Sequence, residues 1–365
     1  AGITMISAAR SAGLADIDAR ALRRVRRVVA GPQAAKVIVD GHAYLNFCSN
    51  DYLGLASDPE VIDAAAEGVK QWGVGSGASH LVIGHSEAHH QLEKALACHT
   101  GQARALLFSS GYQANIGLVT SLAGRGDTVF ADRLNHASLN DAAVLSRAAL
   151  RRYPHADVVT LNRQLDAVNR GRKIIVTDAV FSMDGDIAPI PELLSLAEAH
   201  DAWIIVDDAH GYGVLGARGA GTLSHFGIRS SRVAYMATLG KAAGVSGAFV
   251  AGDDALIEWL IQRARTYIYT TAMPPSLACA LSCSVRKVAA EQWRRDRLAT
   301  LIRLFRARLA GSRYALMPSE TPIQPVVIGA NEAALDLAAA LAVQGMLVPA
   351  IRPPTVPVNT ARLRV

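Results

Sequence analysis

Short apolar runs recur through the middle of the chain, and stretches with helical spacing of apolar positions separate several of them. Continuous apolar runs are typical of strands that are covered on both faces of a sheet, and the spacing between them is typical of helices that pack on that sheet. The pattern therefore predicts an α/β fold. The predicted strands are Ala105–Ser109, Thr128–Phe130, Lys173–Thr177, Trp203–Asp207, Val233–Ala237 and Ala248–Ala251.

The N-terminal part has a different pattern. Between Asp16 and Ala30, apolar residues recur at helical spacing with arginines between them, and Gly31-Pro32 follows. This predicts an amphipathic helix with a basic, solvated face, although one arginine could instead reach an acidic substrate group. Two short strands are expected next, at Lys36–Asp40 and Ala43–Phe47, and Asp58-Pro59 is typical of the start of a helix.

Towards the C-terminus the pattern changes again. After Thr270–Pro275 the helical stretches lengthen, and short strands are predicted at Gln324–Ile328 and Leu347–Ile351. A smaller C-terminal α+β domain is therefore expected beside a larger one. The expected divisions are residues 1–48 for an N-terminal helical segment, 49–272 for the large domain and 273–365 for the small domain.

Composition narrows the class of protein. The 365 residues are 51% hydrophobic and 19% charged, which excludes a disordered chain. Four scattered cysteines do not form a disulfide framework, and no apolar run is long enough to span a membrane. The net charge of +6 suits an anionic small molecule, but no stripe of basic and aromatic residues indicates a nucleic-acid partner. We expect a cytoplasmic globular protein.

Three polar features follow predicted strands, where an α/β sheet forms its ligand crevice. They are Asp207-Asp208-Ala209-His210, Phe181–Asp186 and Thr238-Leu239-Gly240-Lys241. An acid, a histidine and a lysine at neighbouring strand ends suit pyridoxal phosphate, which needs a lysine to bind its aldehyde and a carboxylate beside its ring nitrogen. Taken singly, Lys241 could be a surface lysine and Asp207 a helix cap.

Two other motifs offer alternatives. Gly211–Gly216 fits GxGxxG after a predicted strand, so a nucleotide-binding protein is a remote alternative. However, Asp207–His210 lies between the strand and the glycines, and no clear helix follows. His85 and His89 are four residues apart and could share a helix face as metal ligands. Because there is no HExxH sequence and no obvious general base, no metal is expected.

Several long motifs resemble those of the α-oxoamine synthases. They are Leu45–Leu55, Gly75–His80, Phe181–Asp186, Asp207–Gly211 and Thr238–Lys241. The resemblance implies the fold type I, aspartate-aminotransferase-like architecture with a mostly parallel central sheet. It also implies pyridoxal 5'-phosphate as the cofactor, and a homodimer with the active site at its interface.

Two further segments, Asp132–Leu139 and Ala350–Pro357, are similar to those of the biotin-pathway branch of that family. The resemblance implies condensation of L-alanine with a pimeloyl thioester, carried on coenzyme A or acyl carrier protein, to give 8-amino-7-oxononanoate, carbon dioxide and the free thiol carrier. A glycine C-acetyltransferase activity is the alternative within the family. Relatives continue with a terminal helix beyond Arg362–Val365, so that helix is expected to be missing here.

The resemblance also implies roles for single residues. Lys241 is similar to the lysine that forms the Schiff base, Asp207 to the partner of the pyridine nitrogen, and His136 to the histidine that stacks on the ring. These three are the expected catalytic residues. The other expected cofactor contacts are Ser110, Gly111, Tyr112 and Thr238 at the phosphate, Ser182 and His210 at the phenolic oxygen, and Thr270 or Thr271 at the phosphate across the dimer interface. The expected substrate contacts are Arg23, Asn50, His136, Arg352 and Thr355.

Overall fold

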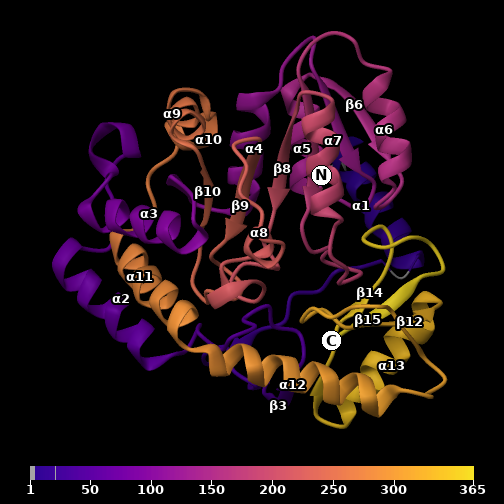
Figure 1. The fold of residues 1–365 in the computed structure, drawn as a ribbon. Helices are drawn as coiled ribbons and strands as arrows, with labels where there is room; N and C mark the ends of the chain where they lie inside the picture. Colours follow the sequence, from indigo (N-terminus) through magenta and orange to yellow (C-terminus); the bar gives the residue numbers. More distant parts are fainter. Residues whose placement is uncertain (1–4, 21) are drawn as a thin grey trace. The chain divides into compact units, whose positions relative to one another are not determined.

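A computed structural model describes residues 5–20 and 22–365 (Figure 1). The chain divides into two compact units. The larger unit holds residues 50–182 and 186–301, and the smaller unit holds residues 1–49, 183–185 and 302–365. Residues 273–301 group with the larger unit. The limits at residues 48 and 272 stay a prediction.

The larger unit is built on a seven-stranded sheet with the order β4-β10-β9-β8-β7-β5-β6. β10 runs antiparallel to its neighbours β4 and β9, and the other pairs in the sheet are parallel. The strands are β4 (Arg104–Phe108), β5 (Thr128–Asp132), β6 (Ala149–Tyr153), β7 (Lys173–Asp178), β8 (Ala202–Asp207), β9 (Val233–Thr238) and β10 (Ala248–Gly252).

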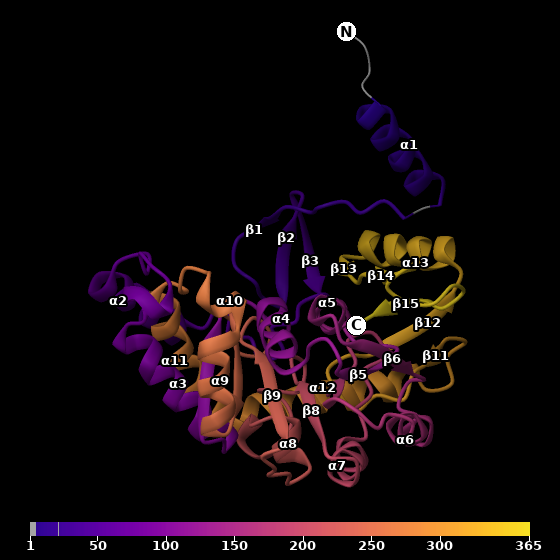
Figure 2. The same cartoon turned by 90° about the horizontal axis from the view of Figure 1, so that it is seen from above.

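Both faces of this sheet are buried. On β8, Ile204 and Val206 pack into one apolar layer while Ile205 packs into the other. In Figure 2, α4 and α5 lie on one side of β8 and β9, and α7 lies on the other. The helices of this unit are α2 (Pro59–Trp72), α3 (Glu87–Thr100), α4 (Gly111–Leu122), α5 (Ala137–Ser146), α6 (Val158–Asp166), α7 (Ile190–Ala199), α8 (Thr222–His225), α9 (Asp254–Arg263), α10 (Arg265–Ile268), α11 (Pro275–Ala290) and the first part of α12 (Gln292–Leu309), with a π-helical turn η1 (His80–Gly84) and a 3₁₀ turn η2 (Ala217–Gly219).

The smaller unit contains two four-stranded sheets, with the orders β1-β2-β3-β13 and β11-β12-β15-β14. Its apolar core includes Val326, Val348 and Leu363. Its elements are α1 (Met5–Ala19), β1 (Val29–Ala30), β2 (Lys36–Val39), β3 (His42–Asn46), β11 (Ala315–Leu316), β12 (Pro325–Gly329), α13 (Asn331–Val343), β13 (Met346–Leu347), β14 (Ala350–Ile351) and β15 (Ala361–Arg364).

The six strands predicted for the large sheet are confirmed, with ends that differ by one or two residues. β6 was missed because its sequence, Ala-Leu-Arg-Arg-Tyr, lies at the edge of the sheet and is only partly buried. The predicted start of α2 is also confirmed, since the Asp58 carboxylate accepts a 3.1 Å hydrogen bond from the backbone N–H of Glu60.

The predicted helix between Asp16 and Ala30 is wrong. The helix ends at Ala19, and Val29–Ala30 forms a strand that pairs with β2. Val25 and Val28 are 80% and 71% exposed. A helix at these positions would therefore gain no stability from burying its apolar face. The predicted strand Leu347–Ile351 is also split, because β13 pairs with β3 while β14 pairs with β15. Among the described residues, no helix is long and apolar enough to cross a membrane.

Candidate active site

The carboxyl ends of β7, β8 and β9 bring the expected site residues to one edge of the large sheet. Asp178 is the last residue of β7 and pairs in register with Asp207, the last residue of β8. Thr238 ends the neighbouring strand β9, and Lys241 follows three residues later. Because these strands are parallel neighbours, the side chains that follow them share one edge of the sheet.

Asp207 is a buried carboxylate, with 3% of the residue exposed. Its Oδ2 accepts a 2.7 Å hydrogen bond from the side-chain amide of Asn115, and its Oδ1 accepts a 3.0 Å bond from the backbone N–H of Ala209. The same amide of Asn115 also donates to the hydroxyl of Ser138 at 2.9 Å. Two donors therefore fix the position of a carboxylate that has little contact with water.

Lys241, His210 and Tyr52 form a chain of side-chain contacts. The Nζ of Lys241 lies 2.8 Å from Nε2 of His210, and Nδ1 of His210 lies 2.7 Å from the hydroxyl of Tyr52. That hydroxyl also donates to Oδ1 of Asn50 at 3.2 Å. One arrangement of protons satisfies all three contacts: Lys241 donates to Nε2, the Nδ1–H donates to the tyrosine oxygen, and the tyrosine proton goes to Asn50.

His136 is the N-cap of α5, and the carboxyl group of Asp178 holds its backbone in place. Its backbone N–H donates a 2.6 Å hydrogen bond to Oδ2 of Asp178, and its Nδ1 lies 2.7 Å from the hydroxyl of Ser138. Burial and the neighbouring charge of Asp207 raise the pKa of Asp178 well above its usual range.

The N-terminus of α4 offers donors for an anion. Ser110 caps this helix by accepting from the backbone N–H of Gln113 at 3.2 Å, and Gly111 and Tyr112 begin its first turn. Thr238 lies close by, since a Cβ built on Gly111 would stand 3.8 Å from the Cβ of Thr238. The unpaired backbone N–H groups of a first helical turn are a common site for phosphate.

The other expected cofactor contacts lie in loops of the same unit. Ser182 is half-buried in a turn that the hydrogen bond from Phe181 N–H to Asp186 C=O closes at 3.0 Å. Thr270 is half-buried and Thr271 is exposed. Thr271 forms an isolated antiparallel bridge with Ser79, so this segment is tied to the Gly75–His80 motif.

Three expected substrate contacts belong to the smaller unit. Arg23 forms an exposed ion pair of 3.2 Å with Asp18, and it lies outside the regular elements. Arg352 and Thr355 follow β14, where the backbone N–H of Thr355 donates to the carbonyl of Arg352 at 3.1 Å. Their roles stay predictions.

Sequence reasoning missed Asn115, Tyr52 and Asp178. Asn115 lies within an apolar helix, where a buried polar residue is a signal that could have been noticed. Tyr52 lies inside the motif Leu45–Leu55 but was not given a role. Asp178 ends its strand as Asp207 ends the next, and this repeated position was the available signal.

The glycines of Gly211–Gly216 serve close packing. A Cβ on Gly211 would lie 2.1 Å from Oδ1 of Asp208 and 2.5 Å from the hydroxyl of Thr222. The 3₁₀ turn η2 directly follows Gly216, and the next helix, α8, begins only at Thr222 and has four residues, so no long helix starts at the glycines to bind a pyrophosphate. This geometry disfavours the nucleotide-binding alternative.

The residues at this edge fit pyridoxal phosphate. They supply an amine at Lys241, a buried carboxylate at Asp207, an imidazole at His136 and a helix N-terminus at Ser110. A charged pyridinium needs the carboxylate, an aldehyde needs the amine, and a phosphate needs the helix N-terminus. All of these groups belong to the larger unit.

Comparison with known proteins adds to this geometry. A model of the aminotransferase class I and II family matches residues 42–365. An 8-amino-7-oxononanoate synthase of Nitrosospira multiformis is 60% identical over 346 residues, which cover 95% of this chain and 87% of that protein. A protein of the same name from Nitrosomonas europaea is 57% identical over 362 residues, which cover 97% of this chain and 92% of that protein.

Two solved structures have the same fold. A structure of SPT with PLP as an internal aldimine has a TM-score of 0.88 at 30% identity, covering 92% of this chain and 86% of that chain. The 8-amino-7-oxononanoate synthase of Francisella tularensis has a TM-score of 0.78 at 32% identity, covering 88% of this chain and 91% of that chain.

Proposed function

The chain belongs to the aminotransferase class I and II family as a pyridoxal-phosphate-dependent enzyme, and from this premise we propose that it joins L-alanine to a pimeloyl thioester. The products are 8-amino-7-oxononanoate, carbon dioxide and the free thiol carrier, in biotin biosynthesis. The names of the curated relatives support this assignment. Within the chain itself, the cofactor chemistry of this proposal is supported by the 2.8 Å contact of Lys241 with His210 and by the buried carboxylate of Asp207.

Lys241 is the proposed anchor and proton carrier. Bound pyridoxal phosphate supplies a protonated ring that accepts electrons from the α carbon of an amino acid. The Nζ of Lys241 binds the cofactor and, once free, takes and returns the α proton. The 2.8 Å contact with Nε2 of His210 orients this amine.

Asp207 and His136 control the ring. The Asp207 carboxylate keeps the ring nitrogen protonated, and the bonds from Asn115 and Ala209 hold that carboxylate in place. His136 stacks on the ring, and Asp178 and Ser138 fix its position. His210 and Ser182 form hydrogen bonds with the phenolic oxygen of the cofactor.

The remaining residues bind the ends of the ligands. Ser110, Gly111, Tyr112 and Thr238 hold the phosphate, and Asn50, Arg23, Arg352 and Thr355 act on the substrate side. We propose a cytoplasmic homodimer in which Thr270 or Thr271 reaches the partner's phosphate site. Val82 and Ile83, at 72% and 83% exposed, provide an apolar surface that supports such an interface.

The first test is a visible spectrum of the purified protein before and after addition of L-alanine, followed by borohydride reduction and peptide mapping. We expect an absorption band that shifts with L-alanine, and a pyridoxyl group on Lys241. Lys241→Arg should lower activity about a thousandfold or more, because a guanidinium is not a nucleophile at neutral pH. Lys70→Arg, an exposed substitution on α2, is the matched control.

The substrate is tested separately. Pimeloyl-CoA and pimeloyl-acyl carrier protein are each offered with L-alanine, and acetyl-CoA is offered with glycine. Product from a pimeloyl thioester with L-alanine supports the proposal, and turnover of acetyl-CoA with glycine alone identifies the alternative activity. A colourless protein that takes up no pyridoxal phosphate would contradict the assignment of the site.

A further inference from the structure

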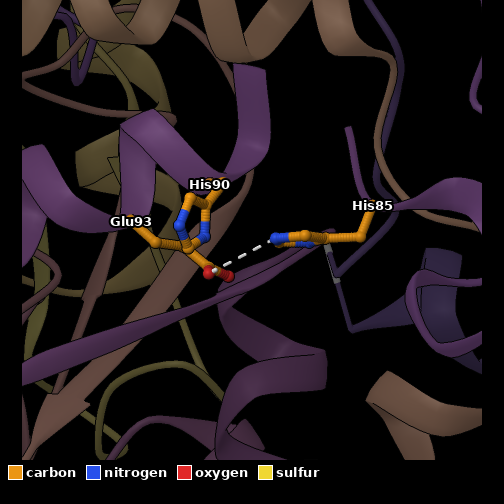
Figure 3. Close-up of side chains that lie close together, drawn as sticks. All are labelled: His85, His90 and Glu93. Atoms are coloured by element: carbon orange, nitrogen blue, oxygen red, sulfur yellow. Dashed lines mark ion pairs between the residues drawn. The ribbon is translucent and has the colours of Figure 1, made fainter. Parts of the chain in front are cut away.

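Three side chains at the start of α3 bring potential metal ligands together, outside the site described above. One ligand atom each from His85, His90 and Glu93 lies within 4.8 Å of the other two. Figure 3 shows His90 and Glu93 projecting from one helix, with His85 facing Glu93 from the preceding segment. The Nε2 of His85 is 3.8 Å from Oε2 of Glu93.

The sequence suggested His85 and His89 as a pair of metal ligands, but in the structure His90 takes the place of His89. His89 is fully buried, its Nε2 lies 2.7 Å from the carbonyl of Met273, and its Nδ1 accepts from the backbone N–H of Ser86 at 3.0 Å. Both of its ring nitrogens are therefore used within the fold. His90, one residue further on, is exposed and lies three residues before Glu93, so both reach the same face of α3.

Second contacts orient two of the three ligands. The Nδ1 of His85 lies 2.9 Å from Nδ1 of His80, which leaves Nε2 directed at Glu93. The Oε1 of Glu93 accepts a 3.0 Å hydrogen bond from the backbone N–H of Leu107, which leaves Oε2 directed at His85. Metal-binding histidines and carboxylates commonly have such outer partners.

The donor set of the cluster suits a cation. It offers one carboxyl group and two imidazoles, with the side chain of Glu93 14% exposed and that of His85 28% exposed. A cation bound between these groups would lie against the largely buried carboxylate of Glu93.

We propose that His85, His90 and Glu93 bind one divalent transition-metal ion of the zinc class, with a water molecule as the fourth ligand. Two imidazoles and one carboxylate suit zinc or cobalt, whereas magnesium and calcium prefer oxygen ligands. Tetrahedral zinc places its ligand atoms about 3.4 Å apart, so rotation of the exposed His90 and a small shift of His85 complete the site.

The bound ion has a defined structural consequence. It joins the segment before α3 to the helix itself. His80, the outer partner of His85, stacks on Tyr267 with ring centroids 4.8 Å apart, close to the segment that carries Thr270 and Thr271. Metal binding therefore stiffens the contact between these two segments.

The test uses the intact holoenzyme after removal of metals by a chelator. Zinc is titrated by calorimetry, and cobalt is titrated by visible spectroscopy. We expect one ion per chain and cobalt bands typical of nitrogen and oxygen ligands in tetrahedral geometry. His90→Gln and Glu93→Gln should each weaken zinc binding about tenfold or more. Glu93→Gln keeps an acceptor for Leu107, so the local fold is retained.

His225→Gln is the matched control, because His225 is an exposed histidine at the end of α8. It should leave zinc affinity unchanged. The proposal is overturned if the wild type binds no stoichiometric ion or if both cluster variants bind zinc as the wild type does. A cobalt spectrum with thiolate charge-transfer bands would also overturn it, because the ion would then be bound to cysteine.

Discussion

The side-chain amide of Asn115 donates a 2.7 Å hydrogen bond to Oδ2 of Asp207, which ties α4 to the buried carboxylate at the end of β8. Helix α4 also begins with the proposed phosphate site at Ser110 and Gly111. One helix therefore sets the positions of two groups that the cofactor contacts at opposite ends. The distance between these groups depends on how α4 packs on the sheet.

Asn115→Leu tests this connection. The substitution keeps the size of the side chain but removes a hydrogen bond to a charged group, which is worth about 1.5–3 kcal/mol. We expect kcat/KM for L-alanine to fall about ten- to hundredfold, together with weaker retention of pyridoxal phosphate. Ser121→Ala on the same helix removes only a bond to the backbone carbonyl of Gly117, and it should leave both quantities near the wild type.

His155 links two loops near the site. Its Nε2 lies 2.8 Å from Oδ2 of Asp186, its Nδ1 lies 3.2 Å from Asp132, and its ring packs edge-on against Phe181. Burial alone would lower the pKa of His155, but the hydrogen bonds to Asp132 and Asp186 outweigh it and raise the pKa to about 10. The protonated histidine therefore holds the loop that contains Ser182.

The raised pKa of His155 predicts a pH dependence of stability. Because the folded value lies above the unfolded value of about 6.5, the contribution is full below about pH 6.5 and is lost as the pH rises towards 10. His155→Gln should lower the free energy of unfolding by about 2–3 kcal/mol at pH 6. Urea unfolding at pH 6, 8 and 10 should show this difference shrinking, and a difference independent of pH would contradict the assignment.

Lys287 connects α11 to the start of α2. This largely buried lysine lies 3.4 Å from Asp58, 2.6 Å from Glu60 and 2.8 Å from Glu291. Hydrogen bonds to Glu291 and Glu60 raise its pKa. The lysine thus neutralises the carboxylate that caps α2.

Lys287→Met should lower the free energy of unfolding by about 2–4 kcal/mol, because it removes one of the two cations beside Asp58 and Glu291 and leaves them only Arg294. Lys70→Met is the matched control, since Lys70 pairs with Glu67 on the exposed face of α2 and should cost less than about 0.5 kcal/mol. Both are measured by chemical denaturation. Equal effects of the two substitutions would refute a special role for Lys287.

Gly211→Ala tests the packing role of the glycine loop. The added methyl group would collide with the buried carboxylate of Asp208. This carboxylate cannot move away easily, because its Oδ2 accepts hydrogen bonds from the Tyr235 hydroxyl at 2.7 Å and from the Thr222 N–H at 2.6 Å. We expect a loss of about 1–3 kcal/mol of stability. Gly124→Ala is the control, because its methyl group would meet nothing nearer than Asp127 at 3.9 Å. Tight binding of a dinucleotide to the wild type would instead support the nucleotide-binding alternative.

The sequence by itself determined the α/β class, six of the seven strands of the large sheet and the family with its cofactor. These predictions are confirmed, and each of them rests on residues that are close together in the sequence. A strand buried on both faces must be apolar over its whole length, and the motifs at the strand ends are contiguous in sequence. The start of α2 at Asp58 is local in the same way.

The tertiary structure decided the end of the first helix and the long-range contacts of the site, because these features depend on which surfaces pack together. Helical spacing after Asp16 did not produce a helix beyond Ala19, since no apolar surface covers Val25. Asn115 contacts Asp207 across 92 positions of the chain, and His90 rather than His89 faces Glu93 because Met273 and Ser86 use both ring nitrogens of His89. Contacts between residues far apart in the chain leave no periodic signal, so only the packed structure shows them.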